Sequence, residues 1–159
     1  MFAYKNESSD ILRESSSGGA FTELANCIIE QGGVVYGAAF KDDWSVHHIC
    51  IDNIDGLKKL RGSKYVQSNI EDCYIDAEKK LKKGTIVLFT GTPCQIKGLK
   101  CFLRKDYPQL LTVDFICHGV PSPGIWKRYL NEEFGKDETC RLQAADGKNT
   151  VLLSVESPP

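Results

Sequence analysis

The stretch TIVLFTGTPCQIKGLKCFLRKDYPQLLTVDFICHG, residues 85–119, holds two apolar runs separated by an amphipathic segment. The runs near 85–90 and 112–117 are almost continuously apolar, which is typical of strands buried on both faces of a sheet. Between them, apolar residues recur at helical spacing over 93–104. A strand, a helix and a strand at this separation form a crossover, so the sequence predicts two parallel neighbouring strands.

The rest of the chain predicts helices around the same sheet. The further elements expected, in chain order, are a helix after the SSSGG turn capped by Ser17 or a neighbour, strand 34–40 with its antiparallel partner 45–51, a short helix before a basic loop, a helix over 70–84, and a helix capped by Ser122 with Pro123 at its first position. The predicted fold class is α/β, with a mixed sheet, a parallel βαβ crossover and flanking helices.

Three regions of different character follow from this pattern. Residues 1–17 are polar and serine-rich and are expected to form an extended lead-in. Residues 18–134 hold the elements of the α/β domain. Residues 135–159 contain a turn signal at Asp146-Gly147 and are expected to form a hairpin-like, truncated tail.

Composition excludes some classes of function. The chain has 159 residues, enough for one domain with a core, and a formal net charge of −1. This charge argues against a protein that grips nucleic acid by its phosphates. No apolar run reaches the ~18 residues that a membrane span needs, and no signal peptide is recognisable at the start. The expectation is therefore a cytoplasmic protein that has no membrane span and does not bind nucleic acid.

One of the seven cysteines stands at the start of a predicted helix. Thr92 and Gln95 match a capping box, and Pro93 suits the first helical position. Cys94 therefore falls in the first turn, where free N–H groups and the helix dipole favour a thiolate. A thiolate can serve as a nucleophile or as a metal ligand.

A second cysteine is predicted to face the same crevice. Cys117 ends the second apolar run, and ligands of open α/β sheets bind outside the carboxyl ends of parallel strands. The alternative, that Cys117 is only the last buried residue of its strand, carries equal weight. No CxxC pair occurs, so the other cysteines are expected to be packed thiols with structural roles: Cys27, Cys50, Cys73, Cys101 and Cys140.

Two further segments have the composition of anion sites. SSSGG precedes a helix, whose N–H groups could hold a phosphate, although a plain capped turn fits equally. LRGSKYVQS offers Arg61, Lys64 and Tyr65 for a pyrophosphate and an aromatic ring, or it is a solvated loop. His47 and His48 point to opposite faces of their strand and cannot share a site.

Five segments in order resemble one known family: SSSGGAFTELA, GGVVYGAAF, LRGSKYVQS, LFTGTPCQIKGLK and DFICHGVPSP. Together they are similar to the coenzyme F420 hydrogenase/dehydrogenase beta-subunit family, from about Ser15 to Phe134. The resemblance implies a flavoprotein that binds FAD and iron–sulfur clusters and passes electrons between a one-electron chain and a two-electron carrier. Complete members extend further, so the sequence is expected to be the N-terminal portion of a longer member.

The resemblance also implies the site residues. Those that correspond to flavin-contacting or crevice positions are Ser17, Gly18, Gly19, Lys64, Tyr65, Gln67, Ser68, Thr90, Gly91, Thr92 and Gln95. His118 is added as a candidate from its place after Cys117 at the crevice, and a helix-cap or hydrogen-bonding role is the alternative for it. Cys94 and Cys117 correspond to ligands of a [4Fe–4S] cluster, which needs four thiolates, so two would have to come from elsewhere. The implied partners are a redox carrier such as ferredoxin or F420 and other oxidoreductase subunits.

Two rival functions remain open at this point. Cys94 could act as a nucleophile with His118 as its base, without any flavin. Alternatively, the chain could be a cofactor-free module that docks to a partner. Visible absorbance of the purified protein separates these hypotheses, since a flavin is yellow and a cluster is brown.

Overall fold

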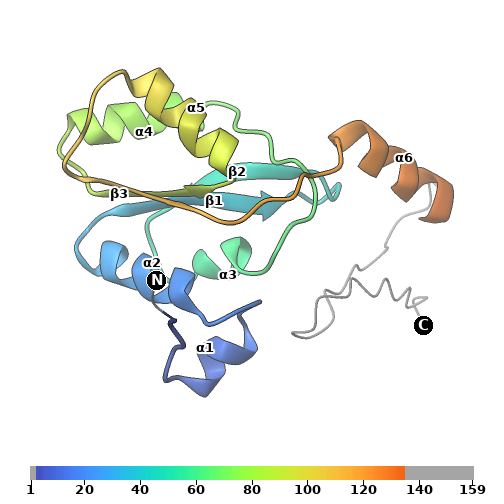
Figure 1. Cartoon of the computed structure of the whole chain (residues 1–159), viewed down its shortest axis with the longest axis horizontal. Helices are drawn as coiled ribbons and strands as arrows, with labels where there is room; N and C mark the ends of the chain where they lie inside the picture. Colours follow the sequence, from blue (N-terminus) through green and yellow to red (C-terminus); the bar gives the residue numbers. More distant parts are fainter. Residues whose placement is uncertain (1–2, 135–159) are drawn as a thin grey trace.

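A four-stranded sheet with the strand order β2-β1-β3-β4 organises the computed structural model, which describes residues 3–134 (Figure 1). The strands are β1 (Val34–Phe40), β2 (Val46–Ile51), β3 (Val87–Gly91) and β4 (Leu110–Asp114). β1 and β2 are antiparallel, whereas β1 pairs with β3, and β3 with β4, in parallel. The mixed sheet expected from the sequence is therefore confirmed.

The crossover that was predicted from residues 85–119 is present. Helix α5 (Pro93–Leu103) connects β3 to β4, and the two strands pair from Val87 opposite Leu110 to Gly91 opposite Asp114. The predicted extent of the second strand was wrong at both ends. It begins earlier than 112 and stops at Asp114, because β3 ends at Gly91 and offers no ladder partner beyond that point.

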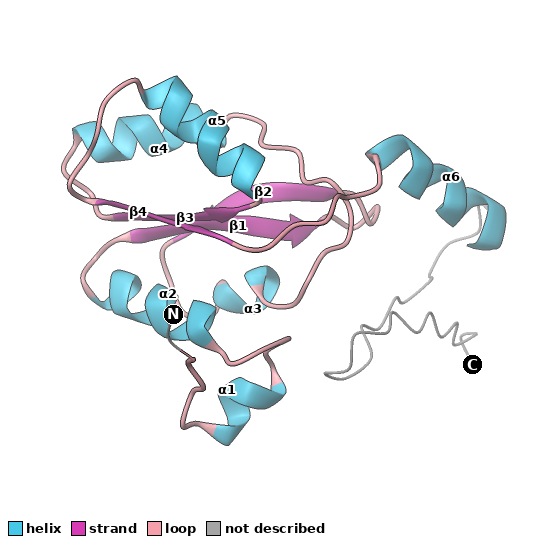
Figure 2. Cartoon of the chain, in the orientation of Figure 1, coloured by secondary structure: helices cyan, strands magenta, loops and turns pink. Residues whose placement is uncertain are grey.

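Helices cover both faces of the sheet (Figure 2). α4 (Cys73–Lys82) and α5 lie on one face, and α2 (Ala20–Glu30) and α3 (Leu57–Leu60) on the other. Successive residues of a strand contribute to the two hydrophobic cores on opposite faces of the sheet. Tyr36 and Phe89 belong to the core beneath α4 and α5. Val35 and Leu88 belong to the core beneath α2 and α3. The central strands β1 and β3 are thus buried on both faces, as their apolar sequence predicts.

The start of the chain differs from the expectation. Residues 1–17 were predicted to be extended, but Ser9–Arg13 form the short helix α1, in which the Ile11 amide donates a hydrogen bond to the hydroxyl of the N-cap residue Ser8. Helix α2 is preceded by Gly19 in the left-handed conformation, with φ of 77°, and no side chain caps it. The predicted cap by Ser17 was therefore wrong, because the chain enters α2 through a glycine turn that only glycine adopts at low cost.

The last described element agrees with its sequence signals. Helix α6 (Pro123–Phe134) begins with proline after Ser122, and the Ser122 hydroxyl accepts a hydrogen bond from the Ile125 amide at 3.3 Å. The hairpin predicted within 135–159 lies outside the described residues. Among the helices of residues 3–134, none has the length and apolarity that a membrane span requires.

The core beneath α5 provides a test of this packing. Leu99 is fully buried between α5 and the sheet, so Leu99→Ala should lower the free energy of unfolding by about 2–5 kcal/mol. Lys100→Ala, at the adjacent exposed position of the same helix, should change it by less than about 0.5 kcal/mol. Urea unfolding followed by circular dichroism measures both, and equal effects of the two variants would contradict the assigned core.

Candidate functional site

The start of α5 has the geometry that the sequence predicts. Thr92 is the N-cap residue with an extended backbone, Pro93 is the first helical residue, and the Gln95 side-chain oxygen accepts the Thr92 amide at 3.0 Å. Cys94 is exposed in the first turn, and its Sγ lies 3.1 Å from the Thr92 hydroxyl. The thiol therefore sits at the positive end of the helix dipole, beyond the carboxyl end of β3.

A loop formed by residues 61–69 reaches this helix start. The Gln95 amide nitrogen donates to the Ser68 carbonyl at 3.1 Å. His48, from β2, lies between the two segments, with Nδ1 at 2.6 Å from the Ser68 hydroxyl and Nε2 at 3.0 Å from the Thr90 carbonyl. We call these four residues, His48, Ser68, Thr90 and Gln95, the His48 network. It joins two of the predicted site segments.

Glycines allow the close packing around this network. A Cβ at Gly91 would lie 3.0 Å from the Gln95 side-chain oxygen and 3.4 Å from His48 Nε2. A Cβ at Gly37 would lie 3.0 Å from the Thr90 hydroxyl, which donates to the Tyr36 carbonyl. Any side chain at these positions would push the network apart, so both glycines serve close approach of backbone to side chain.

The other end of the same loop contacts the region around the SSSGG turn. Arg61 pairs with Glu14 and its Nε donates to the Thr22 hydroxyl at 3.2 Å, while the Ser63 hydroxyl lies 3.4 Å from that of Ser16. The 61–69 loop therefore connects the start of α2 to the start of α5. Among the described residues, no hydrogen bond joins Ser17–Gly19 to Thr90–Gln95, so their sharing of one cleft stays a prediction.

Lys64 is the cation within this loop. Its ammonium donates to the carbonyls of Arg61 at 2.6 Å and Lys59 at 3.1 Å, and burial lowers its pKa to about 8. An ammonium has three donors, so one remains for a ligand. The neighbouring Tyr65 ring is 56% exposed, and the Gln67 amide donates to the Pro121 carbonyl at 3.1 Å.

Local packing explains why glycine residues occupy the SSSGG turn. The Gly18 carbonyl accepts the Asn6 amide at 2.8 Å, and a Cβ at Gly18 would collide with the carbonyl of Tyr4. Because no side chain caps α2, the first N–H groups of this helix stay available at Gly19. Ser17 is exposed beside them.

Cys117 and His118 lie beyond the end of β4, not in a strand. Cys117 is half-buried and its Sγ accepts the Gly119 amide at 3.4 Å, whereas His118 is exposed. Cys94 follows the carboxyl end of β3, whereas Cys117, which was predicted as the last residue of its strand, lies beyond the end of β4 at Asp114. That both cysteines face one crevice stays a prediction. Within residues 3–134, however, no three His, Cys, Asp or Glu side chains are grouped so that they could hold a metal ion.

The remaining described cysteines are of two kinds. Cys50 and Cys73 are half-buried, and burial raises the pKa of both thiols, that of Cys73 to about 11. They are therefore protonated at neutral pH, in keeping with structural roles. Cys27 and Cys101 are exposed, so the expectation that they are packed thiols was wrong. Cys140 lies outside the described residues.

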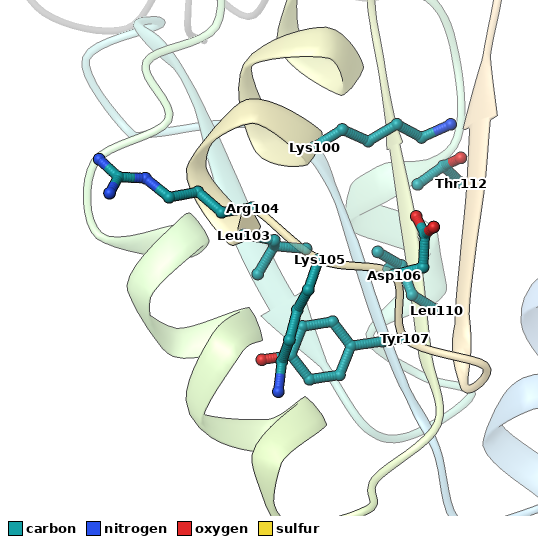
Figure 3. A pocket seen from close by; sticks show the side chains of 8 residues that line it. All are labelled: Lys100, Leu103, Arg104, Lys105, Asp106, Tyr107, Leu110 and Thr112. Carbon is teal, nitrogen blue, oxygen red and sulfur yellow. The ribbon is translucent and has the colours of Figure 1, made fainter.

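A pocket elsewhere on the molecule has no part in the predicted site. It has a volume of about 350 Å³ and lies at the far end of α5, where its lining includes Lys100, Lys105, Asp106 and Tyr107 (Figure 3). Lys105 lies over the Tyr107 ring, 4.6 Å from its centre. None of the residues predicted to bind a cofactor or metal lines this pocket.

His48 is the site residue that sequence reasoning did not select. The alternation of β2 predicted only that His47 and His48 point to opposite faces of the sheet, and it did not say which of them is buried. In the structure His48 is 2% exposed. Its contacts depend on residues 20 and 42 positions away, Ser68 and Thr90. The pairing of β1 with β2 and with β3 brings Thr90 close to His48, and the bridge between His47 and Asn69 brings Ser68 close to it.

Comparison with known protein families gives two matches, one in each half of the chain. Both family models describe the beta subunit of coenzyme F420 hydrogenase/dehydrogenase, one its N-terminal part and the other its C terminus. Residues 1–73 match the first and residues 84–154 match the second. The match thus continues beyond Phe134, where the similarity was expected to end. No curated protein is significantly similar to the chain in sequence.

A solved structure has the same fold. It is a chain from the F420-reducing [NiFe] hydrogenase complex of Methanosarcina barkeri, with a TM-score of 0.64 and 22% sequence identity. The similarity covers 84% of this chain and 49% of that one, so the present chain spans about half the length of the neighbour. With both parts of the beta subunit matched in order, the chain belongs to the coenzyme F420 hydrogenase/dehydrogenase beta-subunit family.

Proposed function

We propose that this chain is a portion of a flavin-dependent oxidoreductase subunit that passes electrons between a one-electron chain and a two-electron carrier, of the F420 type or another. The observation that carries the proposal is the 61–69 loop. It contacts the start of α2 at one end and the Thr90–Gln95 segment at the other. That segment follows a parallel strand at its carboxyl end, where α/β sheets bind their ligands.

The described residues fit the phosphates of FAD. The start of α2 offers uncapped N–H groups after Gly18 and Gly19, and the Ser16 and Ser63 hydroxyls lie beside one another near it. Lys64 adds a cation with a free donor in the same loop as Ser63. Backbone N–H groups at a helix start together with a lysine are a suitable cradle for a diphosphate.

The other end of the loop would hold the reactive part of the cofactor. The His48 network holds Ser68 and the Thr90–Gln95 segment in a fixed relative position, so together they would form one side of the cofactor site. Tyr65 and Gln67 are exposed on the connecting residues and are available for contacts with the bound group. A bound flavin supplies the exchange between single-electron and two-electron transfer.

A [4Fe–4S] cluster does not fit the described residues alone. Such a cluster takes four thiolates, and Cys94 and Cys117 are the two that the family resemblance selects. No group of three metal-binding side chains exists within residues 3–134. In this proposal, cluster binding requires ligands from outside the described part of the chain.

The proposed partners follow from the comparison with the solved structure. That structure is part of a hydrogenase complex, which favours further oxidoreductase subunits as partners. A ferredoxin or F420 would serve as the redox carrier. The two rival functions, a Cys94-dependent thiol enzyme and a cofactor-free module, predict a colourless protein. Within the described part of the chain, the Cys94 sulfur forms its hydrogen bond with the Thr92 hydroxyl and none with the proposed base His118.

Replacement of Lys64 tests the phosphate contact. Lys64→Glu exchanges attraction for repulsion and should weaken FAD binding at least about tenfold, as measured by quenching of FAD fluorescence. Lys58→Glu, an exposed lysine of α3 with the same charge change, is the control and should leave the affinity within about twofold. If the two variants bind FAD with equal affinity, Lys64 does not contact the phosphates of FAD.

The pH dependence of FAD binding gives a second test of Lys64. Its pKa of about 8 lies below the usual 10.5, and a bound phosphate favours the ammonium form. As pH rises from 7 to 9 the free protein loses this proton, so FAD affinity should fall by about tenfold. Lys64→Arg stays charged throughout and should bind FAD with little change over that range. A flat profile for the unaltered protein would contradict the assignment.

Alkylation of two cysteines on one helix tests the environment of Cys94. Cys94 and Cys101 are both exposed, but they lie in the first turn and near the last turn of α5. Because the dipole stabilises a thiolate only at the helix start, Cys94 should react with iodoacetamide about two- to fivefold faster at pH 7. Peptide mapping measures both rates in one sample. If Cys101 reacts as fast, Cys94 has no special reactivity as a ligand or nucleophile.

A further inference from the structure

His48 has contacts that its neighbours in β2 lack. It is 2% exposed, and its ring stacks on Phe89 with centres 5.5 Å apart and 14° between the planes. Phe89 itself stacks on Tyr36, so the imidazole belongs to a fixed aromatic column. Both ring nitrogens nevertheless reach polar groups in different segments, Ser68 in the 61–69 loop and Thr90 near the end of β3. A buried histidine with two fixed partners has a defined orientation and a defined proton position.

The partners determine which nitrogen carries the proton. The Thr90 carbonyl can only accept, so Nε2 must donate to it over 3.0 Å. A neutral ring then leaves Nδ1 as an acceptor for the Ser68 hydroxyl, which lies 2.6 Å away. Burial lowers the pKa of His48 and so favours this neutral form. The ring is therefore a bridge that accepts from the Ser68 hydroxyl of the loop and donates to the Thr90 carbonyl of β3.

Gln95 forms a second bridge between the same segments. Its amide nitrogen donates to the Ser68 carbonyl, and its oxygen accepts both the amide and the hydroxyl of Thr92 at 3.0 and 3.1 Å. Ser68 is thus held through its side chain by His48 and through its main chain by Gln95. The missing side chain at Gly91 leaves the room that both bridging groups need.

From this geometry we infer that His48, as the neutral Nε2–H tautomer, is a positioning residue that sets the 64–69 loop against Thr90–Gln95. This inference rests on the proposed function, because it assigns the two segments to one cofactor site. His48 does not contact the cofactor in this role. It fixes the relative position of the loop that carries Lys64 and of the helix start that carries Cys94.

Three variants separate this role from general stability. His48→Gln and Ser68→Ala each break the bridge between Ser68 and the ring. His47→Gln is the matched control, because His47 is adjacent in β2 but on the opposite face. Hydrogen–deuterium exchange of the protein without cofactor should rise at least about fivefold in residues 64–69 and 90–95 for the first two variants only. Exchange in α4 should stay unchanged.

Two further measurements distinguish the inference from the proposed function. Nitrogen-15 NMR of the unaltered protein should show His48 protonated at Nε2, with the Nδ1 signal moving in Ser68→Ala. FAD titration should show about tenfold weaker binding for His48→Gln and for Ser68→Ala, with little added loss in the double variant. If the unaltered protein binds no FAD, the proposed function fails, but exchange and NMR still decide the position of the loops.

Three results would overturn the inference. The first is the same exchange in residues 64–69 and 90–95 for His48→Gln and Ser68→Ala as for the control His47→Gln. The second is a His48 ring protonated at Nδ1 in the unaltered protein. Uniformly increased exchange, including α4, would also reject it, because His48 would then be a core residue without a local positioning role.

Discussion

The parallel pairing of β1 with β3 is the constraint on which the rest of the structure depends. Val34, Val35 and Tyr36 pair with Val87, Leu88 and Phe89, and these residues are all buried or nearly so. The pair joins a strand from the N-terminal family segment to a strand from the C-terminal one. Both helix layers pack on these two strands. The two family segments therefore share one sheet and one pair of cores.

The candidate site depends on the same pairing. β1 brings β2, and so His48, to within hydrogen-bonding distance of the carbonyl of Thr90 at the end of β3. The Thr90 hydroxyl also connects β3 to β1, because it donates a hydrogen bond to the Tyr36 carbonyl. Ser68 and Gln95 then complete a polar network in which each hydrogen bond crosses between separate segments. Such networks specify relative positions more strongly than single bonds do.

Local signals predicted the crossover and the start of α5 correctly. The capping box and Pro93 determined where that helix begins, and therefore where Cys94 lies. Apolar content alone misled at Phe115 and Ile116, which are 57% and 87% exposed, because a strand needs a partner as well as apolar residues. The uncapped start of α2 was missed because Gly18 packs against distant residues: its carbonyl accepts the Asn6 amide, and a Cβ on it would meet the Tyr4 carbonyl. The helix at Ser9–Arg13 was missed although its Ser8 cap is a local signal. His48 was missed because its partners are distant in sequence.

The order of synthesis gives the β1–β3 pair another consequence. Val34 pairs with Val87, 53 residues later in the chain. At a ribosomal rate of roughly 5–20 residues per second, β1 waits about 3–10 s for its parallel partner to be made. β2 follows β1 directly and can cover one edge in that interval, and α2, α3 and α4 are also made before β3, but the edge of β1 that pairs with β3 stays open. A nascent chain of this fold therefore carries an unpaired edge on an apolar strand for seconds, and unpaired strand edges make incomplete chains prone to aggregate.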